Sequence, residues 1–330
     1  MRKKIISILV TAALMMAVLA GCGSPKTADT DTVVVAALKG PTSMGLVSLM
    51  ERAEREETDI SYEFIMETSA DTLLPMILKG EADIALVPAN VASVLYNKTL
   101  ASDMAGNEIV VIDINTLGVL YMVTGNDSVS GIKDLEGKTV YLMGKGTTPD
   151  YVLNYLLTEN QVENVTLEYK SEATEVAAVL ANDPEAIGLL PQPFVTAACI
   201  QNDSLKVALD LNQEWEALQG EGGSSLVTGV TIVKRNFAEE HGDLIRRFMA
   251  EHKASIEDVN SNPEKGAALV VKAGIVEKEP IAAKAIPNCN LTYLEGKEMK
   301  QALSGYLEVL YGQNPEFIGG ALPQDDFYYK

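Results

Sequence analysis

The sequence predicts an α/β protein of two similar lobes, each containing βαβ units and joined to the other by two β crossover segments. The strongest observation is an internal repeat, because a strand–helix–strand–helix–strand pattern over residues 33–90 recurs over residues 139–191. Such units form parallel sheets through right-handed crossovers. The second observation is the length of 330 residues, which suffices for two lobes with apolar cores.

The two copies share landmarks at matching distances. Each has a strand that ends in Lys-Gly followed by hydroxyl residues and a helical stretch, and each closes on an apolar strand that ends in proline. The offset is 106 residues between Lys39 and Lys145, and 103 residues between Pro88 and Pro191. The segments predicted in between are a strand at 62–66 and a helix at 69–79 in the first copy, and a strand at 165–169 and a helix at 173–180 in the second.

Two β segments bracket the second copy, so they are natural places for the chain to cross between the lobes. They lie near 115–123, at the end of a long β segment interrupted around 115–118, and at 226–233. The predicted lobes are therefore residues 32–115 together with 230–330, and residues 116–229. The remaining expected elements are helices at 90–99, 194–200, 243–260, 263–272 and 297–311, a strand at 205–211, a polar glycine-rich stretch at 212–225 and a loop from 273 to 294.

The start of the chain predicts export and lipid anchoring. Three cations, Arg2, Lys3 and Lys4, precede an apolar run over residues 5–20 that is short for a transmembrane helix and fits the core of a signal peptide. The run ends in Leu-Ala-Gly-Cys22, which resembles a bacterial lipobox, so we expect cleavage after residue 21 and a lipid on the Cys22 sulfur. An ordinary secretory signal with an unrelated cysteine is the alternative. Residues 22–31 are small and polar, which is typical of a flexible tether.

The net charge excludes some classes of partner. The full chain carries a formal charge of −20, and loss of residues 1–21 leaves 23 basic against 46 acidic residues, a charge of −23. This balance argues against a nucleic-acid partner, which requires a basic face. It also disfavours direct adsorption to anionic lipid. Most of the acidic residues are expected to form a solvated surface.

The sequence contains no recognisable catalytic or metal-binding motif. His241 and His252 are eleven residues apart on one helical stretch, about 16 Å, which is too far to share a metal. Cys199 and Cys289 match no CxxC or zinc spacing, so two unrelated thiols are expected, with a disulfide as the alternative. We therefore expect no enzymatic activity, no cofactor and no metal.

The chain resembles the substrate-binding lipoproteins of ATP-binding-cassette (ABC) importers, and more narrowly their nitrate/sulfonate/taurine and thiamine-precursor-like subgroup. The resemblance covers nearly everything after Cys22. It implies the type II periplasmic binding protein fold, hinge closure on a small ligand, delivery to a permease and ATPase complex, a monomeric state and an extracytoplasmic, membrane-anchored location. Gln192 stands where relatives often have Glu before Pro-Phe. The stretches that carry the resemblance are Gly80-Glu81-Ala82-Asp83-Ile84-Ala85, Asp127-Ser128 with Asp134-Leu135-Glu136-Gly137-Lys138, Lys145-Gly146-Thr147-Thr148 and Leu190-Pro191-Gln192-Pro193-Phe194.

The candidate ligand site lies at the strand ends of both copies, where glycine and hydroxyl residues open helices. Helix starts offer free N–H groups and the positive end of the helix dipole, although helix capping by Ser and Thr is the alternative. The two β segments and the polar stretch add further candidates, among them Tyr121 and Trp215 for stacking on a flat ligand, with core packing as the alternative for Tyr121. The predicted ligand-binding residues are Lys39, Gly40, Pro41, Thr42, Ser43, Asn90, Thr116, Tyr121, Gly146, Thr147, Thr148, Gln192, Trp215 and Thr228.

The chemistry of these candidates favours a small organic anion or a polar heterocycle with acceptor edges, because they offer donors and no carboxylate. A free metal ion is disfavoured for the same reason. For Lys39 and Lys145, contact with the ligand and exposure to solvent both remain open. A lipid-anchored sensory protein of the same fold, and less readily a thiamine-precursor enzyme, remain alternative functions.

Overall fold

The computed structural model describes residues 32–101, 108–220 and 223–330. The expected signal peptide, Cys22 and the tether lie outside these residues. Within the described part of the chain, no helix combines the length and the apolar character that crossing a membrane requires.

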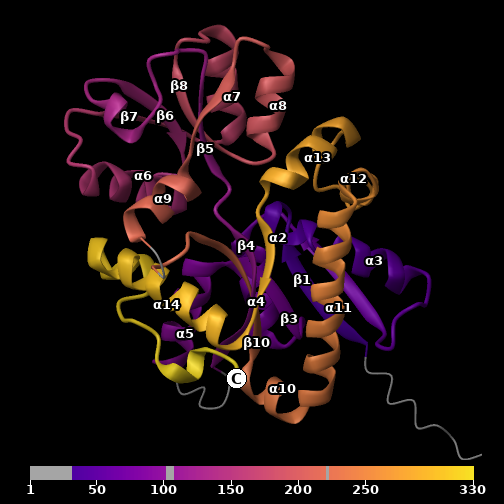
Figure 1. Cartoon of the computed structure of the whole chain (residues 1–330). Helices are drawn as coiled ribbons and strands as arrows, with labels where there is room; N and C mark the ends of the chain where they lie inside the picture. The colour runs from indigo at the N-terminus through magenta and orange to yellow at the C-terminus, as the bar shows by residue number, and fades with distance from the viewer. Residues whose placement is uncertain (1–31, 102–107, 221–222) are drawn as a thin grey trace, which may run out of the picture. The chain divides into compact units, whose positions relative to one another are not determined.

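The described part of the chain forms two sheets, of which the first has six strands in the order β11-β4-β10-β3-β1-β2. Its strands β4, β10, β3 and β1 are labelled in Figure 1. The first copy of the repeat supplies the parallel strands β1, β2 and β3, while β10 pairs antiparallel with both β3 and β4. These strands are β1 (Val33–Leu38), β2 (Tyr62–Glu67), β3 (Ile84–Pro88), β4 (Ile109–Leu117), β10 (Val227–Lys234) and β11 (Leu291–Leu294).

The second sheet repeats this arrangement with five strands in the order β7-β6-β8-β5-β9. The second copy supplies the parallel strands β6, β7 and β8, and β5 pairs antiparallel with β8 as β10 does with β3. The α/β class with two similar sheets, expected from the repeat, is thereby confirmed. These strands are β5 (Leu120–Thr124), β6 (Thr139–Met143), β7 (Thr166–Lys170), β8 (Ile187–Pro191) and β9 (Lys206–Asp210).

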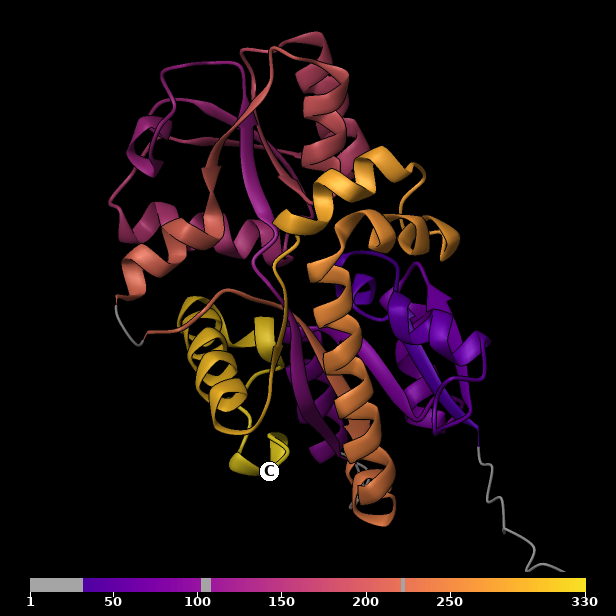
Figure 2. The same ribbon diagram turned by 45° about the vertical axis from the view of Figure 1, so that its right-hand side comes forward.

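Helices connect the strands of both sheets; among the C-terminal helices, α10, α11 and α14 contact the first sheet, and α13 contacts α8. The long α11 buries Ile245, Phe248, Ile256 and Val259 at helical spacing, and it packs against α3 and β4 (Figure 2). The helices are α2 (Pro41–Met44), α3 (Val47–Glu54), α4 (Ala70–Lys79), α5 (Ala89–Leu100), α6 (Thr148–Glu159), α7 (Ala173–Asn182), α8 (Phe194–Gln201), α9 (Leu211–Gln219), α10 (Arg235–Glu240), α11 (Gly242–Ser261), α12 (Pro263–Lys272), α13 (Glu279–Ala285) and α14 (Gly296–Gln313). Short 3-10 turns are η1 (Ile132–Leu135), η2 (Ile286–Asn288), η3 (Pro315–Ile318) and η4 (Asp325–Phe327).

The structure corrects three expectations about local structure. The helix after Gly40 is two helices, α2 and α3, and Gly45 between them lies so close to α11 that a Cβ there would be 2.6 Å from Ile256 Cγ1. The stretch from 212 begins as helix α9, because the Asp210 side chain caps it and Trp215 is buried on one face. The region 273–294, expected to be a loop, contains α13, η2 and β11.

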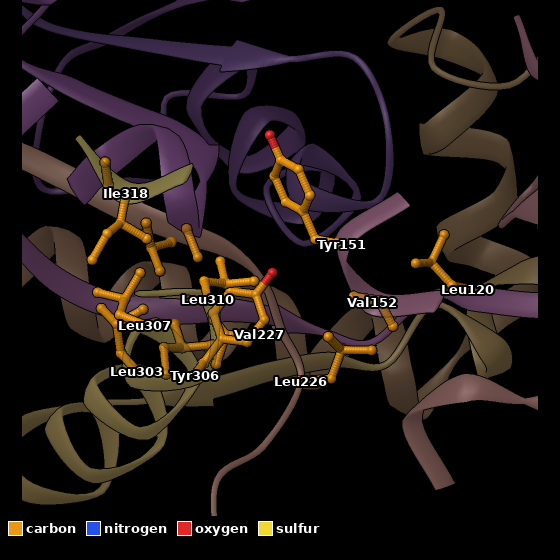
Figure 3. Packing of buried hydrophobic residues seen from close by; sticks show 14 of the residues in the cluster. Leu120, Tyr151, Val152, Leu226, Val227, Leu303, Tyr306, Leu307, Leu310 and Ile318 are labelled. Carbon is orange, nitrogen blue, oxygen red and sulfur yellow. The ribbon is translucent and has the colours of Figure 1, made fainter. Parts of the chain in front are cut away.

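One buried apolar cluster contains residues of both sheets and of α14. Figure 3 shows Tyr306, Leu307 and Leu310 of α14 together with Leu226 and Val227, where the chain returns from the second sheet to the first. Tyr151 of α6, which belongs to the second copy of the repeat, lies in the same cluster and stacks on Phe317 with ring centroids 3.4 Å apart. The two sheets therefore share apolar contacts as well as chain connections.

Candidate functional site

Several of the predicted residues lie together at one end of the first sheet, where β1 and β3 finish; we call this end the first edge. Pro88 at the end of β3 pairs with Gly229 of β10, and Gly229 pairs with Thr116 of β4. β1 runs parallel to β3, so Gly40 and the start of α2 lie at this same edge. The structure thus brings the predicted residues of the first copy together with Thr116 and Thr228.

The second sheet has an equivalent edge. Leu120 pairs with Pro191, and Tyr121 pairs with Asp210, so Gln192 and Tyr121 lie close together where β8 ends. The start of α6 follows the parallel strand β6 at the same edge. Only two residues separate the end of β4 at Leu117 from the start of β5 at Leu120, which limits this span to about 10 Å. The two edges are therefore neighbours.

At the start of α2, the hydroxyl groups are used mainly within the helix start. Ser43 Oγ donates to the Gly40 carbonyl at 3.0 Å and accepts from the Gly40 N–H at 3.3 Å, and the side chain is fully buried. Thr42 Oγ1 lies 3.5 Å from the Leu38 carbonyl. Gly40 has a φ of 152° with open space where a Cβ would point, so a ligand can approach the backbone there.

The start of α6 contains a carboxylate that the sequence reasoning missed. The Asp150 carboxylate is nearly buried and accepts from the Gly146 N–H at 2.8 Å, from Asn154 Nδ2 at 2.6 Å and from the Tyr169 hydroxyl at 2.7 Å. These donors satisfy both of its oxygens. The exposed Thr147 donates its hydroxyl to the Gly144 carbonyl at 2.6 Å and makes no side-chain cap.

The two lysines are exposed and lie near other groups. Lys145 Nζ lies 5.3 Å from the centroid of the Tyr169 ring, which is cation–π geometry. Lys39 Nζ lies 3.5 Å from the position that a Cβ on Gly274 would occupy, beyond the end of α12. A ligand role for Lys39 stays a prediction.

Three predicted side chains retain free hydrogen-bonding groups. Among the described residues, the Asn90 amide and the Thr228 hydroxyl have no hydrogen-bond partner, and both residues are half-buried. Gln192 accepts at Oε1 from the Thr196 hydroxyl at 2.8 Å, which leaves its Nε2 group without a described acceptor. These groups are available to a ligand.

The two aromatic candidates are buried. Tyr121 donates its hydroxyl to the Asn288 carbonyl at 2.8 Å, and burial raises the pKa of its phenol. Trp215 is 0 % exposed, packs against Tyr155 and Tyr306, and donates from Nε1 to Ser224. The structure therefore places Trp215 in the core, not at a surface where a ligand could stack.

A cavity of about 580 Å³ opens beside Tyr121 and Gln192, between the end of β9, α8 and the α13–η2 segment. It is lined by two carboxylates, Asp203 and Asp210, and one cation, Lys284. Burial raises the pKa of the Asp210 carboxyl. The expectation of a carboxylate-free site was therefore incomplete. The other predicted residues do not line this cavity.

Behind the first edge lies a row of buried polar groups, of which the sequence predicted only Thr116 as a site residue. Asp113, Asn115 and Thr116 are at most 1 % exposed, although their strand is otherwise apolar, and they connect to Thr231 and His252. The sequence feature that could have indicated this row is Asp-Ile-Asn-Thr inside an apolar run, which by itself predicts only an interruption of the strand.

Neither a metal cluster nor a disulfide is found among the described residues. No group of three or more His, Cys, Asp and Glu side chains in that part of the chain could hold a metal ion. Cys199 and Cys289 are free thiols, and burial raises the pKa of the Cys289 thiol to about 12.

Comparisons with solved structures identify the fold. A structure described as an ABC transporter from Parabacteroides distasonis superposes with a TM-score of 0.76 at 23% identity, over 92% of this chain and 99% of that one. The periplasmic aliphatic sulphonate binding protein SsuA from Escherichia coli gives 0.69 at 15% identity, over 90% and 95% of the two chains. The periplasmic nitrate-binding protein NrtA from Synechocystis PCC 6803 gives 0.58 at 12% identity, over 82% and 75%.

These similarities show the periplasmic binding protein fold. No curated protein sequence matches the chain significantly. The family model described as NMT1/THI5 like matches residues 56–266, which is more than half of the chain. The protein therefore belongs to the NMT1/THI5-like family.

Proposed function

We propose that this protein is the extracytoplasmic substrate-binding component of an ABC importer, which holds a small ligand between two lobes and delivers it to a membrane permease. One observation carries the proposal: two repeated units present equivalent helix starts at neighbouring sheet edges. The lobes would comprise residues 32–115 with 230–330, and residues 116–229. Helix starts on both sides supply donors to one ligand, which favours the closed state of a clamp.

The ligand class that fits is a small polar heterocycle or an organic anion. The free groups of Asn90, Thr228 and Gln192 supply donors and acceptors. Asp150 does not repel an anion strongly, because three donors already satisfy its carboxylate. The Asp210 carboxyl beside Gln192 can accept from ligand N–H groups, which favours the heterocycle over a simple anion.

Binding rather than catalysis is supported by the solved relatives. Two of the similar structures are named as binding proteins, for sulphonate and for nitrate. A sensory role would use the same site, and purification with or without a permease partner separates the two functions.

The proposed clamp can be tested with four probes: nitrate, ethanesulfonate, taurine and 4-amino-2-methylpyrimidine. We expect isothermal titration to show saturable binding of at least one probe and small-angle scattering to show a smaller radius of gyration on saturation. Trp215 is the only tryptophan and lies between Tyr155 of α6 and Tyr306 of α14, so its emission should change on closure. Binding that leaves both the radius and the emission unchanged would contradict the clamp.

The expected anchor has its own test. Replacing Cys22 with alanine should move the protein from the membrane fraction to the soluble extracytoplasmic fraction, because the modified sulfur is its only expected membrane attachment. Fractionation with immunoblotting measures this, and circular dichroism checks that the fold is retained. A Cys22→Ala protein that stays with the membrane would refute lipid anchoring.

A further inference from the structure

A row of buried polar side chains runs behind the edge where α2 starts. Asp113, Thr116, Thr231 and His252 are 0 % exposed and Asn115 is 1 % exposed. Burial of a carboxylate costs several kcal/mol unless its oxygens are paired. Replacing such a group by apolar residues of similar volume is often neutral or stabilising, so stability alone does not explain this row.

The hydrogen bonds of the row converge on the Asp113 carboxylate from two sides. His252 Nδ1 lies 3.3 Å from Asp113 Oδ2, within reach of a hydrogen bond in which Nδ1 donates to the carboxylate. Thr231 donates to Asp113 Oδ1 at 2.7 Å, so its oxygen is left to accept from Asn115 Nδ2 at 3.2 Å. Asn115 Oδ1 in turn accepts from the Thr116 hydroxyl at 2.9 Å.

The direction of these bonds fixes how the Asn115 amide is turned. The carboxylate makes Thr231 a donor, and Thr231 then requires the NH₂ side of Asn115. The carbonyl side of Asn115 therefore faces Gly229, where an added Cβ would clash with both Asn115 Oδ1 and Thr42 Cγ2. Asn115 and Thr42 thus meet across Gly229, next to Thr228.

One group in the row is left without a partner. The buried Nε2 of His252 has no hydrogen bond within the described part of the chain, and an apolar residue at this position would avoid that cost. The rings of Phe248 and Tyr293 pack against the imidazole, with centroids 5.4 and 6.1 Å from its own. The ring is therefore held in contact with Asp113 despite an unsatisfied nitrogen.

We propose that Asp113, Thr231 and His252 are positioning residues for the ligand site, which hold the Asn115 amide in one orientation and thereby fix Thr42 and the start of α2. This inference rests on the proposed ligand site at that edge. None of the three touches the ligand. Their effect is to keep the donors at this edge in the geometry that binding requires.

Thr231→Val is the most direct test, because it keeps the shape of the side chain and removes the hydroxyl that links Asp113 to Asn115. Thr231→Ser is the matched control, because it keeps the hydroxyl. In titrations of the full chain with the four probes named above, we expect the valine variant to bind about tenfold more weakly and the serine variant within about twofold of the parent. In hydrogen–deuterium exchange without ligand, the amides of Gly40 and of residues 42–46 should exchange at least fivefold faster in the valine variant only.

The two measurements separate failure of this inference from failure of the proposed function. Unchanged exchange and binding in Thr231→Val would overturn the inference, as would equal acceleration in both variants, which indicates general loosening. If no probe binds the parent chain, the proposed ligand class fails, and the exchange measurement alone decides the positioning role.

Discussion

Trp215→Ala should lower the free energy of unfolding by about 3–5 kcal/mol, the range for loss of a large buried aromatic side chain. The indole is fully buried, contacts Tyr155 and Tyr306, and donates to Ser224. Removing it leaves a cavity where α9 meets α6 and α14. Urea unfolding followed by circular dichroism measures the loss.

Trp215→Phe is the control, because phenylalanine keeps most of the ring packing and should cost clearly less. Measuring probe binding together with stability also separates a core-packing role of Trp215 from a ligand-stacking role. A ligand-stacking tryptophan, as the sequence predicted, would reduce probe binding on mutation with little change in stability. That outcome would contradict its placement in the core.

Gly229→Ala should weaken probe binding at least tenfold and lower the free energy of unfolding by about 1–3 kcal/mol, as overpacking does. The new methyl group would clash with Thr42 and Asn115, and α2 would have to move from its place at the sheet edge. Isothermal titration and urea unfolding give the two values.

Two further variants test whether the clash with Thr42 causes the losses expected for Gly229→Ala. Gly131→Ala adds a methyl group in open space and should change neither binding nor stability by a comparable amount. In the Gly229→Ala background, Thr42→Ser removes the clashing Thr42 methyl group and should restore part of the lost stability. No improvement in the double variant would mean that Thr42 is not the group displaced.

The regular part of the fold could be predicted because its signals are local. The strands of both repeats and helix α12 follow from short-range hydrophobic patterns, and Pro263–Lys272 agrees residue for residue with the expected helix. The glycines at 220, 222 and 223 suggested a loop from 212, yet α9 forms because Trp215 gains burial in a distant contact. Tertiary packing there overrides the local composition.

The candidate site was only partly predictable. The repeat located both helix starts, since parallel strands end at a common edge. Nothing local in the sequence connects Asp113 with His252, which lies far along the chain, or turns Asp150 toward the Gly146 N–H. Pairings of this kind depend on how α11 and α6 pack, and a single sequence carries no direct signal for them.

The strand order of the first sheet has a consequence for synthesis of the chain. β10 lies between β3 and β4, and its Val227 pairs with Leu117, which precedes it by 110 positions. At about 5–20 residues per second, a ribosome needs roughly 5–20 seconds for that interval. All five strands of the second sheet are made within it. Until β10 emerges, the sides of β3 and β4 that it pairs lack their partner, and unpaired strands of this kind are the sites where chains associate edge to edge.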